Sequence, residues 1–237
     1  MTQDWLFDFG NTRLKCAPLG DDGVVGDVRA LAPDAFDALP RGEVAFVASV
    51  APEAARVALL DALAQRFRRI AIARTLPALH GLRIAYATPA RLGVDRFLAM
   101  VGARDAYPAL LVGVGTALTI DLVDADGKHL GGRIAPSPTL MREALSARAA
   151  QLAPVGGTYA EFADDTDDAL ASGCEGAAIA LVERSHAHAT QRLGRAPTML
   201  LHGGGADALR DRLPHATRRT GLVLDGLARW AMLERAA

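Results

Sequence analysis

The chain has 237 residues, which suits one large domain or two small lobes. Its 51% hydrophobic but only 5% aromatic residues predict a closely packed core of Ala, Leu and Val. A formal net charge of -1, without long blocks of one sign, disfavours nucleic acid and membrane surfaces as main partners. We also find no membrane-spanning stretch, no secretory signal and only two cysteines, Cys16 and Cys174, and we therefore expect a cytoplasmic protein.

The first expected element is a β-hairpin over residues 6–19, in which two apolar runs flank a polar turn. Gly10 allows this turn a positive φ or the close approach of a ligand. The turn carries a carboxylate at Asp8, which suits Mg²⁺, and an amine at Lys15, which suits phosphate. A phosphate-binding turn and an ordinary solvated hairpin are equally weighted alternatives.

A βαβ unit is expected next. Residues 44–50 form an apolar run typical of a buried strand, and residues 70–73 form a second one. Between them, Pro52 opens a helix that continues to Phe67 with apolar residues at helical spacing. Part of the sheet is therefore expected to be parallel.

The rest of the chain continues the alternation of strands and helices. The expected elements are, in order, a helix over 91–107, a strand-turn-strand over 110–123, a strand over 130–134, helices over 139–151 and 167–193, a strand over 198–201 that ends at Gly203-Gly204-Gly205, and a helix from 222 onward. The glycine run permits a flat group such as a nucleoside to press against the backbone, and a flexible connection is comparably favoured.

The opening hairpin has an internal echo. The segment Asp8-x-Gly10-Asn-Thr12 resembles Gly113-x-Gly115-Thr116, and apolar runs flank both. Two related lobes whose hairpins face a shared cleft would cradle a nucleotide phosphate from two sides. The alternative is that the two segments resemble each other by chance, to which we give odds of roughly one in three.

A second polar motif is Gly93-Val94-Asp95-Arg96, at an expected helix start. Asp95 suits the acceptance of a proton from a substrate hydroxyl, and Arg96 suits a carboxylate. A helix-start carboxylate with a surface salt bridge is the favoured alternative when the motif is taken alone. The acidic run around Thr166 is interpreted as a solvated loop in which Thr166 caps the following helix, and a cap hydroxyl that faces a ligand is the alternative.

Four motifs occur in order along the chain: Asp8-x-Gly-Asn-Thr-x-x-Lys15, Gly93-x-Asp95-Arg96, Gly115-Thr116-Ala117-x-Thr119-x-Asp121 and Gly131-Gly132-x-Ile134-x-Pro136. This ordered set resembles type III pantothenate kinases of the actin, hexokinase and Hsp70-like ATPase superfamily. The resemblance implies an α/β fold of two ribonuclease-H-like lobes, residues 1–108 and 109–237, with mixed sheets flanked by helices and an ATP cleft between them. It also implies a homodimer that phosphorylates pantothenate to 4'-phosphopantothenate, the first step of coenzyme A biosynthesis.

The resemblance assigns roles by position. The ATP-phosphate and Mg²⁺ segment is Asp8, Phe9, Gly10, Asn11, Thr12, Arg13, Leu14 and Lys15, with Asp8 as the candidate Mg²⁺ ligand, and Thr116 is a second phosphate contact. The pantothenate contacts are Tyr86, Gly93, Val94, Asp95, Arg96 and Thr166. Asp95 is the proton acceptor, and in the family the threonine matched by Thr166 reaches the substrate across the dimer interface.

The chain departs from the family pattern at two places. Family members usually carry Asp, a monovalent-cation ligand, where this chain has Gly113, so we expect the K⁺ or NH₄⁺ site to be weakened, lost or rebuilt. Ser137-Pro138 stands where Gly usually follows the Ile-x-Pro motif, which predicts a stiffer loop.

Two other functions remain open at this point. One is a non-catalytic regulatory relative of the family, which the missing cation ligand favours. The other is a different small-molecule kinase of the same superfamily, which Tyr86 and the Asp95-Arg96 pair disfavour because sugars lack the carboxylate that Arg96 would meet.

Overall fold

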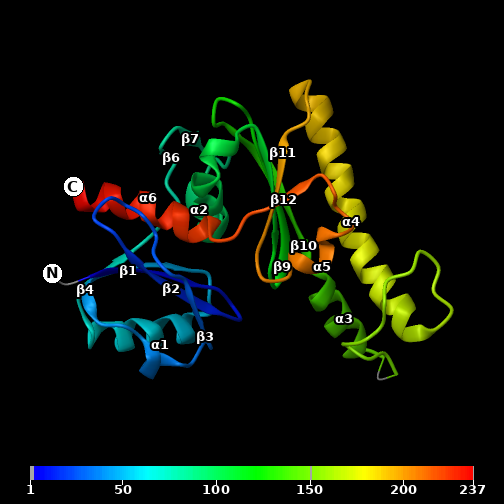
Figure 1. The fold of residues 1–237 in the computed structure, drawn as a ribbon, viewed down its shortest axis with the longest axis horizontal. Helices are drawn as coiled ribbons and strands as arrows, with labels where there is room; N and C mark the ends of the chain where they lie inside the picture. Colours follow the sequence, from blue (N-terminus) through cyan, green and yellow to red (C-terminus); the bar gives the residue numbers. More distant parts are fainter. Residues whose placement is uncertain (1–2, 150, 237) are drawn as a thin grey trace. The chain divides into compact units, whose positions relative to one another are not determined.

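The computed structural model describes residues 3–149 and 151–236 (Figure 1). Internal contacts divide the chain into two compact units. The first unit contains residues 1–106, 126–129 and 221–237, and the second contains residues 107–125 and 130–220. The expected boundary between the lobes, after residue 108, lies close to Ala106, where the first segment of the first unit ends. The C-terminal helix, however, belongs to the first unit and not to the expected 109–237 lobe. No helix in the described ranges is long and apolar enough to cross a membrane.

The elements of the first unit are β1 (Asp4–Phe9), β2 (Leu14–Leu19), β3 (Arg29–Leu31), η1 (Phe36–Ala38), β4 (Gly42–Ser49), α1 (Glu53–Ala64), β5 (Phe67–Ile72), β6 (Ala78–Leu79), β7 (Leu82–Arg83), η2 (Pro89–Arg91), α2 (Val94–Gly102), η3 (Arg104–Ala106) and α6 (Leu222–Ala236). Those of the second unit are β8 (Ala109–Val114), β9 (Ala117–Val123), β10 (His129–Pro136), α3 (Pro138–Ser146), α4 (Thr166–Leu193), β11 (Thr198–His202), α5 (Asp207–Arg210) and β12 (Ala216–Arg218). The first residue of β10, His129, is grouped with the first unit by its contacts, while the rest of the strand lies in the second unit.

The first unit contains a five-stranded mixed sheet in the order β3-β2-β1-β4-β5. The expected hairpin and βαβ unit are both confirmed: β1 pairs antiparallel with β2, while β4 pairs in parallel with β1 and β5. Alternate residues of β1, beginning with Trp5, pack with Leu59 and Leu63 of α1. The other face of β1, which includes Asp8, therefore points to the side of the sheet that α2 and α6 cover.

The two helices on that side cross with their backbones in contact. A Cβ atom added to Gly102 would lie inside the backbone of Leu222, and one added to Gly226 would lie inside that of Leu98. Phe46 of β4 contacts Trp230 of α6 edge to face, with ring centroids 6.3 Å apart. The backbone contacts hold the second half of α2 against α6. The first turn of the same helix carries Asp95.

The second unit repeats the strand order of the first. Its sheet has the order β10-β9-β8-β11-β12, with β8 antiparallel to β9 and parallel to β11. β1 and β8 therefore occupy equivalent places, and the internal echo is a structural repeat. The even-numbered residues of β8, from Leu110 to Val114, pack against Ala178 and Val182 of α4, which leaves Gly113 on the opposite face.

The helices of the second unit differ from the expected ones at their ends. α3 ends at Ser146 instead of residue 151, and residue 150 lies outside the described ranges. Ser137 is its N-cap and accepts a hydrogen bond from Leu140 N–H, while Pro138 occupies the first helical position. The Ser-Pro pair thus starts a helix. At α4 the cap is Asp165, which accepts from Asp168 N–H, and Thr166 is the first helical residue instead of the expected cap.

Candidate functional site

Asp8 is a partly exposed carboxylate near the end of β1. It pairs across the hairpin with Lys15 and, on its other side, with Ala48 of β4. Burial raises the pKa of Asp8 from 3.8 to about 6, the positive charge of Lys15 opposes this rise, and the negative charge of Asp95 adds to it. Asp8, Lys15 and Asp95 therefore interact within the first unit, although Asp95 is 87 residues away from Asp8 in sequence.

The turn after Asp8 contains both exposed and core residues. Gly10 donates its N–H to Arg13 O (3.1 Å) and does not adopt a left-handed φ, so the positive φ, one of the two expected uses of this glycine, is not realised. A Cβ on Gly10 would have only an ordinary 3.7 Å contact, so the space beside it remains open for a ligand. Phe9 and Leu14 are buried in the core, whereas Asn11, Thr12 and Arg13 are exposed.

Asp95 lies in the first turn of α2, where its carboxylate folds back over Gly93. The Oδ1 atom of Asp95 lies 2.6 Å from the place that a Cβ on Gly93 would take. Gly93 is the N-cap residue, with no side-chain cap hydrogen bond. The carboxylate of Asp95 therefore occupies the space beside Gly93, and a side chain at residue 93 would displace it.

Arg96 and Tyr86 form the second polar pair of the first unit. Arg96 is buried, with 7% of its surface exposed, and its Nη1 donates to the hydroxyl of Tyr86 (3.5 Å). The loop before α2 is held by Thr75, whose hydroxyl donates to Leu92 O (2.8 Å). The structure therefore brings Tyr86, Val94 and the Asp95-Arg96 pair to one end of α2.

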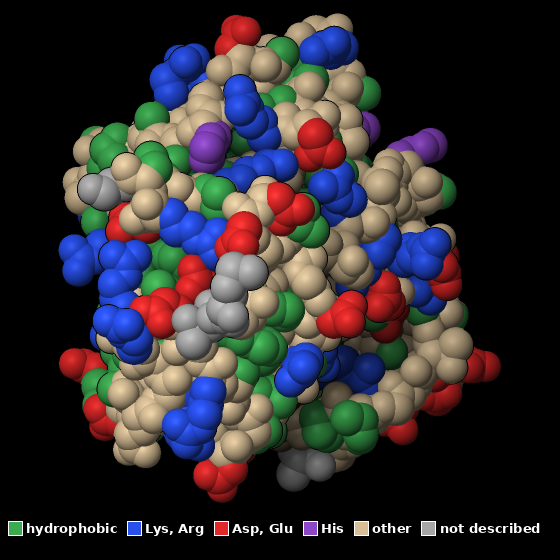
Figure 2. All heavy atoms as spheres, turned by 60° about the vertical axis from the view of Figure 1, so that its left-hand side comes forward, with side chains coloured by type: hydrophobic (Ala, Val, Ile, Leu, Met, Phe, Trp, Pro, Cys, Tyr) green, Lys and Arg blue, Asp and Glu red, His purple; other side chains and the backbone are tan. Residues whose placement is uncertain are grey.

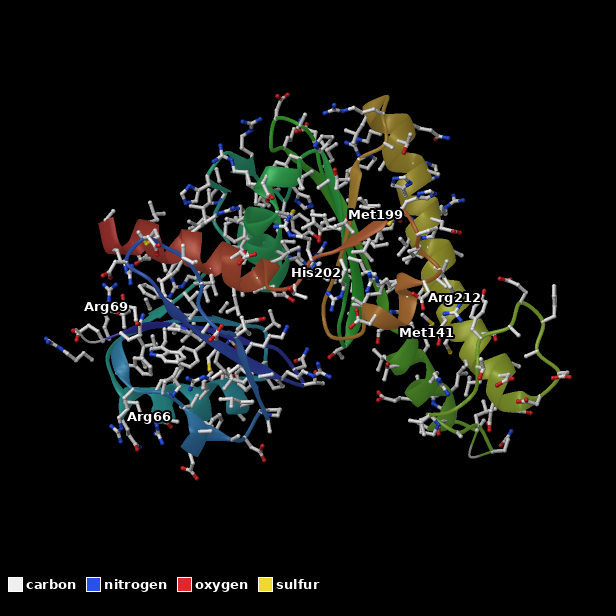
Figure 3. The ribbon with its side chains drawn as sticks, viewed as in Figure 1. Arg66, Arg69, Met141, Met199, His202 and Arg212 are labelled. Carbon is white, nitrogen blue, oxygen red and sulfur yellow. The ribbon has the colours of Figure 1, made fainter. Side chains whose placement is uncertain are left out.

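In the second unit, Thr116 is exposed in the two-residue turn that joins β8 and β9. Gly113 precedes this turn and pairs with Thr119 on one side and His202 on the other. A Cβ on Gly113 would lie 2.7 Å from Thr119 Oγ1 and 3.0 Å from His202 Nε2. Figure 3 shows His202 at the end of β11. Where the first unit has Asp8 beside Ala48, the second has Gly113 beside His202.

The glycine run after β11 has a packing role. Gly203 has a φ of +95°, and a Cβ there would lie inside the backbone of Val114. Gly205 donates its N–H to Val114 O (3.0 Å), and Arg218 Nη2 donates to Gly203 O (2.9 Å). Gly203 and Gly205 therefore pack this run against Val114, the last residue of β8.

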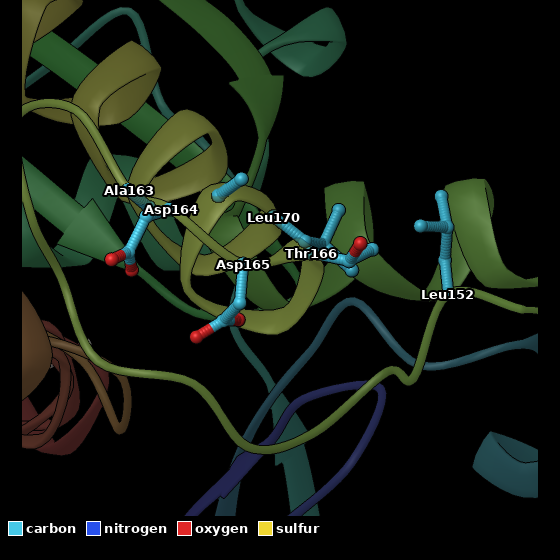
Figure 4. Close-up of a pocket in the computed structure, with 7 residues that line it drawn as sticks. Leu152, Ala163, Asp164, Asp165, Thr166 and Leu170 are labelled. Atoms are coloured by element: carbon cyan, nitrogen blue, oxygen red, sulfur yellow. The ribbon is translucent and has the colours of Figure 1, made fainter.

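Thr166 is exposed and lies in the second unit, whereas the other candidate pantothenate contacts lie in the first. It borders an open pocket of about 430 Å³ with Asp164, Asp165 and Leu152 (Figure 4). The two carboxylates give this pocket an acidic edge.

Asp8 is the candidate side-chain ligand for a metal ion in the first unit. Among the described residues, no group of three or more His, Cys, Asp or Glu side chains gathers as a metal cluster. Asp8 is a hard oxygen donor whose raised pKa reports a carboxylate poorly solvated by its surroundings. This fits Mg²⁺, which is commonly held by one or two carboxylates together with water and substrate phosphates.

Sequence patterns missed two residues near the site, His129 and His202, because single histidines without a spacing pattern carry no signal. On the face in Figure 2, acidic and basic side chains are interspersed, in keeping with the near-neutral net charge.

Two mixed sheets of equivalent strand order, each flanked by helices, define an α/β fold of two units. The fold is similar to a solved structure described as a conserved putative Baf family transcriptional activator from Campylobacter jejuni, with a TM-score of 0.68, 21% identity and coverage of 98% of this chain and 100% of that one. It is also similar to the activator of 2-hydroxyisocaproyl-CoA dehydratase from Clostridium difficile with bound ADPNP, with a TM-score of 0.50, 11% identity and coverage of 99% and 96%.

Sequence comparison gives the family. The family model for type III pantothenate kinase matches residues 5–188. A type III pantothenate kinase from Xanthomonas campestris pv. campestris (strain B100) is 58% identical over 235 residues, which cover 96% of this chain and 97% of the relative. The chain therefore belongs to the type III pantothenate kinase family.

Proposed function

We propose that this protein is a kinase that transfers the γ-phosphoryl group of ATP to the primary hydroxyl of pantothenate. The observation that carries the proposal is the grouping of Asp8, Lys15 and Asp95, in a chain that belongs to this family. The reaction opens coenzyme A biosynthesis. Both cysteines are free thiols, which supports a cytoplasmic location for the enzyme.

Each polar residue has a task in this reaction. Asp95 accepts a hydrogen bond from the pantothenate hydroxyl and takes its proton as the new bond to phosphorus forms. Arg96 and Tyr86 bind the carboxylate end or backbone of pantothenate, and the buried guanidinium presents a rigid pair of donors. Lys15 and the exposed Asn11, Thr12 and Thr116 donate to phosphate oxygens.

Mg²⁺ bound near Asp8 would supply charge neutralisation on the transferring phosphoryl group. Asp8 must be ionised to hold it, and the nearby ammonium of Lys15 favours that ionised form. Gly10 leaves the space beside the turn open, so that phosphate oxygens can approach the backbone N–H groups.

The proposal is tested by ATP consumption measured with and without pantothenate, with the product detected as a phosphorylated acid by mass spectrometry. We expect turnover that requires pantothenate. A common hexose offered in its place should give none, because it lacks the carboxylate that Arg96 meets. Failure to consume ATP with pantothenate would favour the regulatory alternative, and turnover with the hexose would favour another small-molecule kinase.

We also propose that the enzyme does not depend on K⁺ or NH₄⁺. Gly113 brings no carboxylate, and His202 and Thr119 crowd the space that a side chain at this position would use. We expect similar rates in Na⁺, K⁺ and NH₄⁺ at constant ionic strength, and strong activation by K⁺ would contradict this.

Gly113→Asp should lower the melting temperature, because overpacking costs about 1–3 kcal/mol.

A homodimer is the proposed assembly, with the second copy covering an apolar cavity of about 670 Å³ between α3 and α4. The cavity is lined by Leu140, Met141, Leu145 and Leu170, among others. The same unit also exposes 99% of Phe162, and exposed apolar surface of this kind is typical of a protein interface. Sedimentation should give about twice the chain mass of 24.9 kDa. Leu145→Glu should yield a monomer. Leu233 on α6 is 45% exposed against 46% for Leu145, and Leu233→Glu should leave the dimer intact. A monomeric wild-type protein would contradict the proposal.

A further inference from the structure

His129 is a fully buried histidine that none of the roles above uses. It is the first residue of β10, and none of its surface is exposed. Together with residues 126–128, it is grouped by its contacts with the first unit, which carries the candidate pantothenate residues. A buried imidazole requires hydrogen-bond partners, so its contacts indicate what it does.

The imidazole of His129 stacks on the phenol ring of Tyr86. The ring centroids are 6.0 Å apart and the planes differ by 20°. The Nδ1 atom accepts a hydrogen bond from the backbone N–H of Ala85 (3.5 Å), the residue before Tyr86. This acceptance requires the tautomer that carries its proton on Nε2. His129 thus contacts both the ring of Tyr86 and the backbone that leads into it.

The backbone around His129 is tied to the same loop. Gly127 has a φ of +75°, and its carbonyl accepts from Arg83 N–H (2.8 Å). A Cβ on Gly127 would lie inside the backbone of Gly81, so only glycine permits this approach. Lys128 also forms a β-bridge with Arg83. The segment that delivers His129 is therefore fixed to the segment that delivers Tyr86.

We propose that His129 is a positioning residue for pantothenate binding, acting through Tyr86. The stack holds the phenol ring on one side, while Arg96 donates to its hydroxyl, so the ring has one orientation before the substrate arrives. Without the imidazole the ring gains rotational freedom, and pantothenate binding must then restrict it. This inference rests on the proposed function and on the assignment of Tyr86 to pantothenate.

The test is a double-mutant cycle with His129→Leu, Tyr86→Leu and the double variant. The KM for pantothenate and its Kd by calorimetry are measured beside the KM for ATP. Aromatic pairs are worth about 0.5–1.5 kcal/mol, so His129→Leu should raise the KM and Kd for pantothenate about two- to twelvefold and leave the KM for ATP unchanged. In the Tyr86→Leu background, the same change should have no further effect.

His129→Phe keeps a stacking ring and guards against a variant that fails to fold, and it should restore most of the affinity. His188→Ala, at an exposed position of α4, is the matched control and should change neither constant. Equal effects of His129→Leu in both backgrounds, or a lower melting temperature with unchanged pantothenate affinity, would overturn the inference. A wild-type protein that neither binds nor phosphorylates pantothenate would instead refute the proposed function.

Discussion

Asp95→Asn is expected to lower kcat for pantothenate phosphorylation by a factor of about 10²–10⁴, the usual contribution of a general base. The amide keeps the shape of the carboxylate but cannot accept the substrate proton. ATP should still bind with its wild-type affinity, because the proposed phosphate-binding groups are unchanged. Steady-state kinetics and calorimetric titration with ATP measure the two effects separately. Near-normal turnover in this variant would refute the assigned role.

A second variant tests the same role without changing the carboxylate. In Gly93→Ala the new Cβ would lie 2.6 Å from Asp95 Oδ1, so the carboxylate must move. Moving the carboxylate out of line with the substrate hydroxyl is expected to lower kcat about tenfold to a hundredfold, although Asp95 itself is still present. Asp61→Asn, which changes an exposed carboxylate on α1, is the matched control and should leave kcat unchanged.

Asp8→Asn is expected to abolish turnover and, at the same time, to stabilise the metal-free protein at pH 8. The raised pKa of Asp8, about 6, means that the folded protein disfavours the ionised carboxylate. A pKa change from 3.8 to about 6 corresponds to about 3 kcal/mol, and solvent screening of a partly exposed group reduces this to about 2 kcal/mol. The amide carries no charge, so this penalty disappears. Chemical denaturation in EDTA measures the gain.

The pH dependence of this gain has a fixed sign. Between pH 4 and 6 the unfolded chain has lost the proton of Asp8 while the folded protein retains it, so the wild type loses stability as the pH rises. The advantage of Asp8→Asn should therefore be absent below pH 4, grow up to pH 6 and stay constant above. An advantage that is the same at pH 4 and pH 8 would contradict the assigned origin of the effect. Asp61→Asn should show no such trend.

Local patterns predicted the parts of the site that lie within one hairpin or one helix start. The Asp8–Lys15 hairpin was expected from alternating apolar runs around a glycine, and β1 and β2 confirm it. The echo at Gly113 was expected from a few residues, and the identical strand order of the two sheets confirms the repeat. In both cases the information is carried by neighbours in sequence.

The remaining features depend on residues that are distant in sequence. Nothing near Asp8 indicates that Asp95 raises its pKa, because the approach results from packing α2 on the sheet. The tail from residue 222 was expected as a helix, but its place beside α2 depends on the backbone contact at Gly102 and Gly226. His129 showed no pattern because its partners, Tyr86 and Ala85, lie over 40 residues away.

The division of the chain into units has a consequence for gene truncation. Because α6 completes the first unit, a stop codon near residue 221 would remove the helix that covers Leu98 and Gly102, although every candidate site residue would still be translated. Arg235, which binds Asp4 of β1 (2.6 Å), would be lost with it. During synthesis on the ribosome, the Asp8 hairpin and α2 must therefore wait for α6 to be translated before their unit can close.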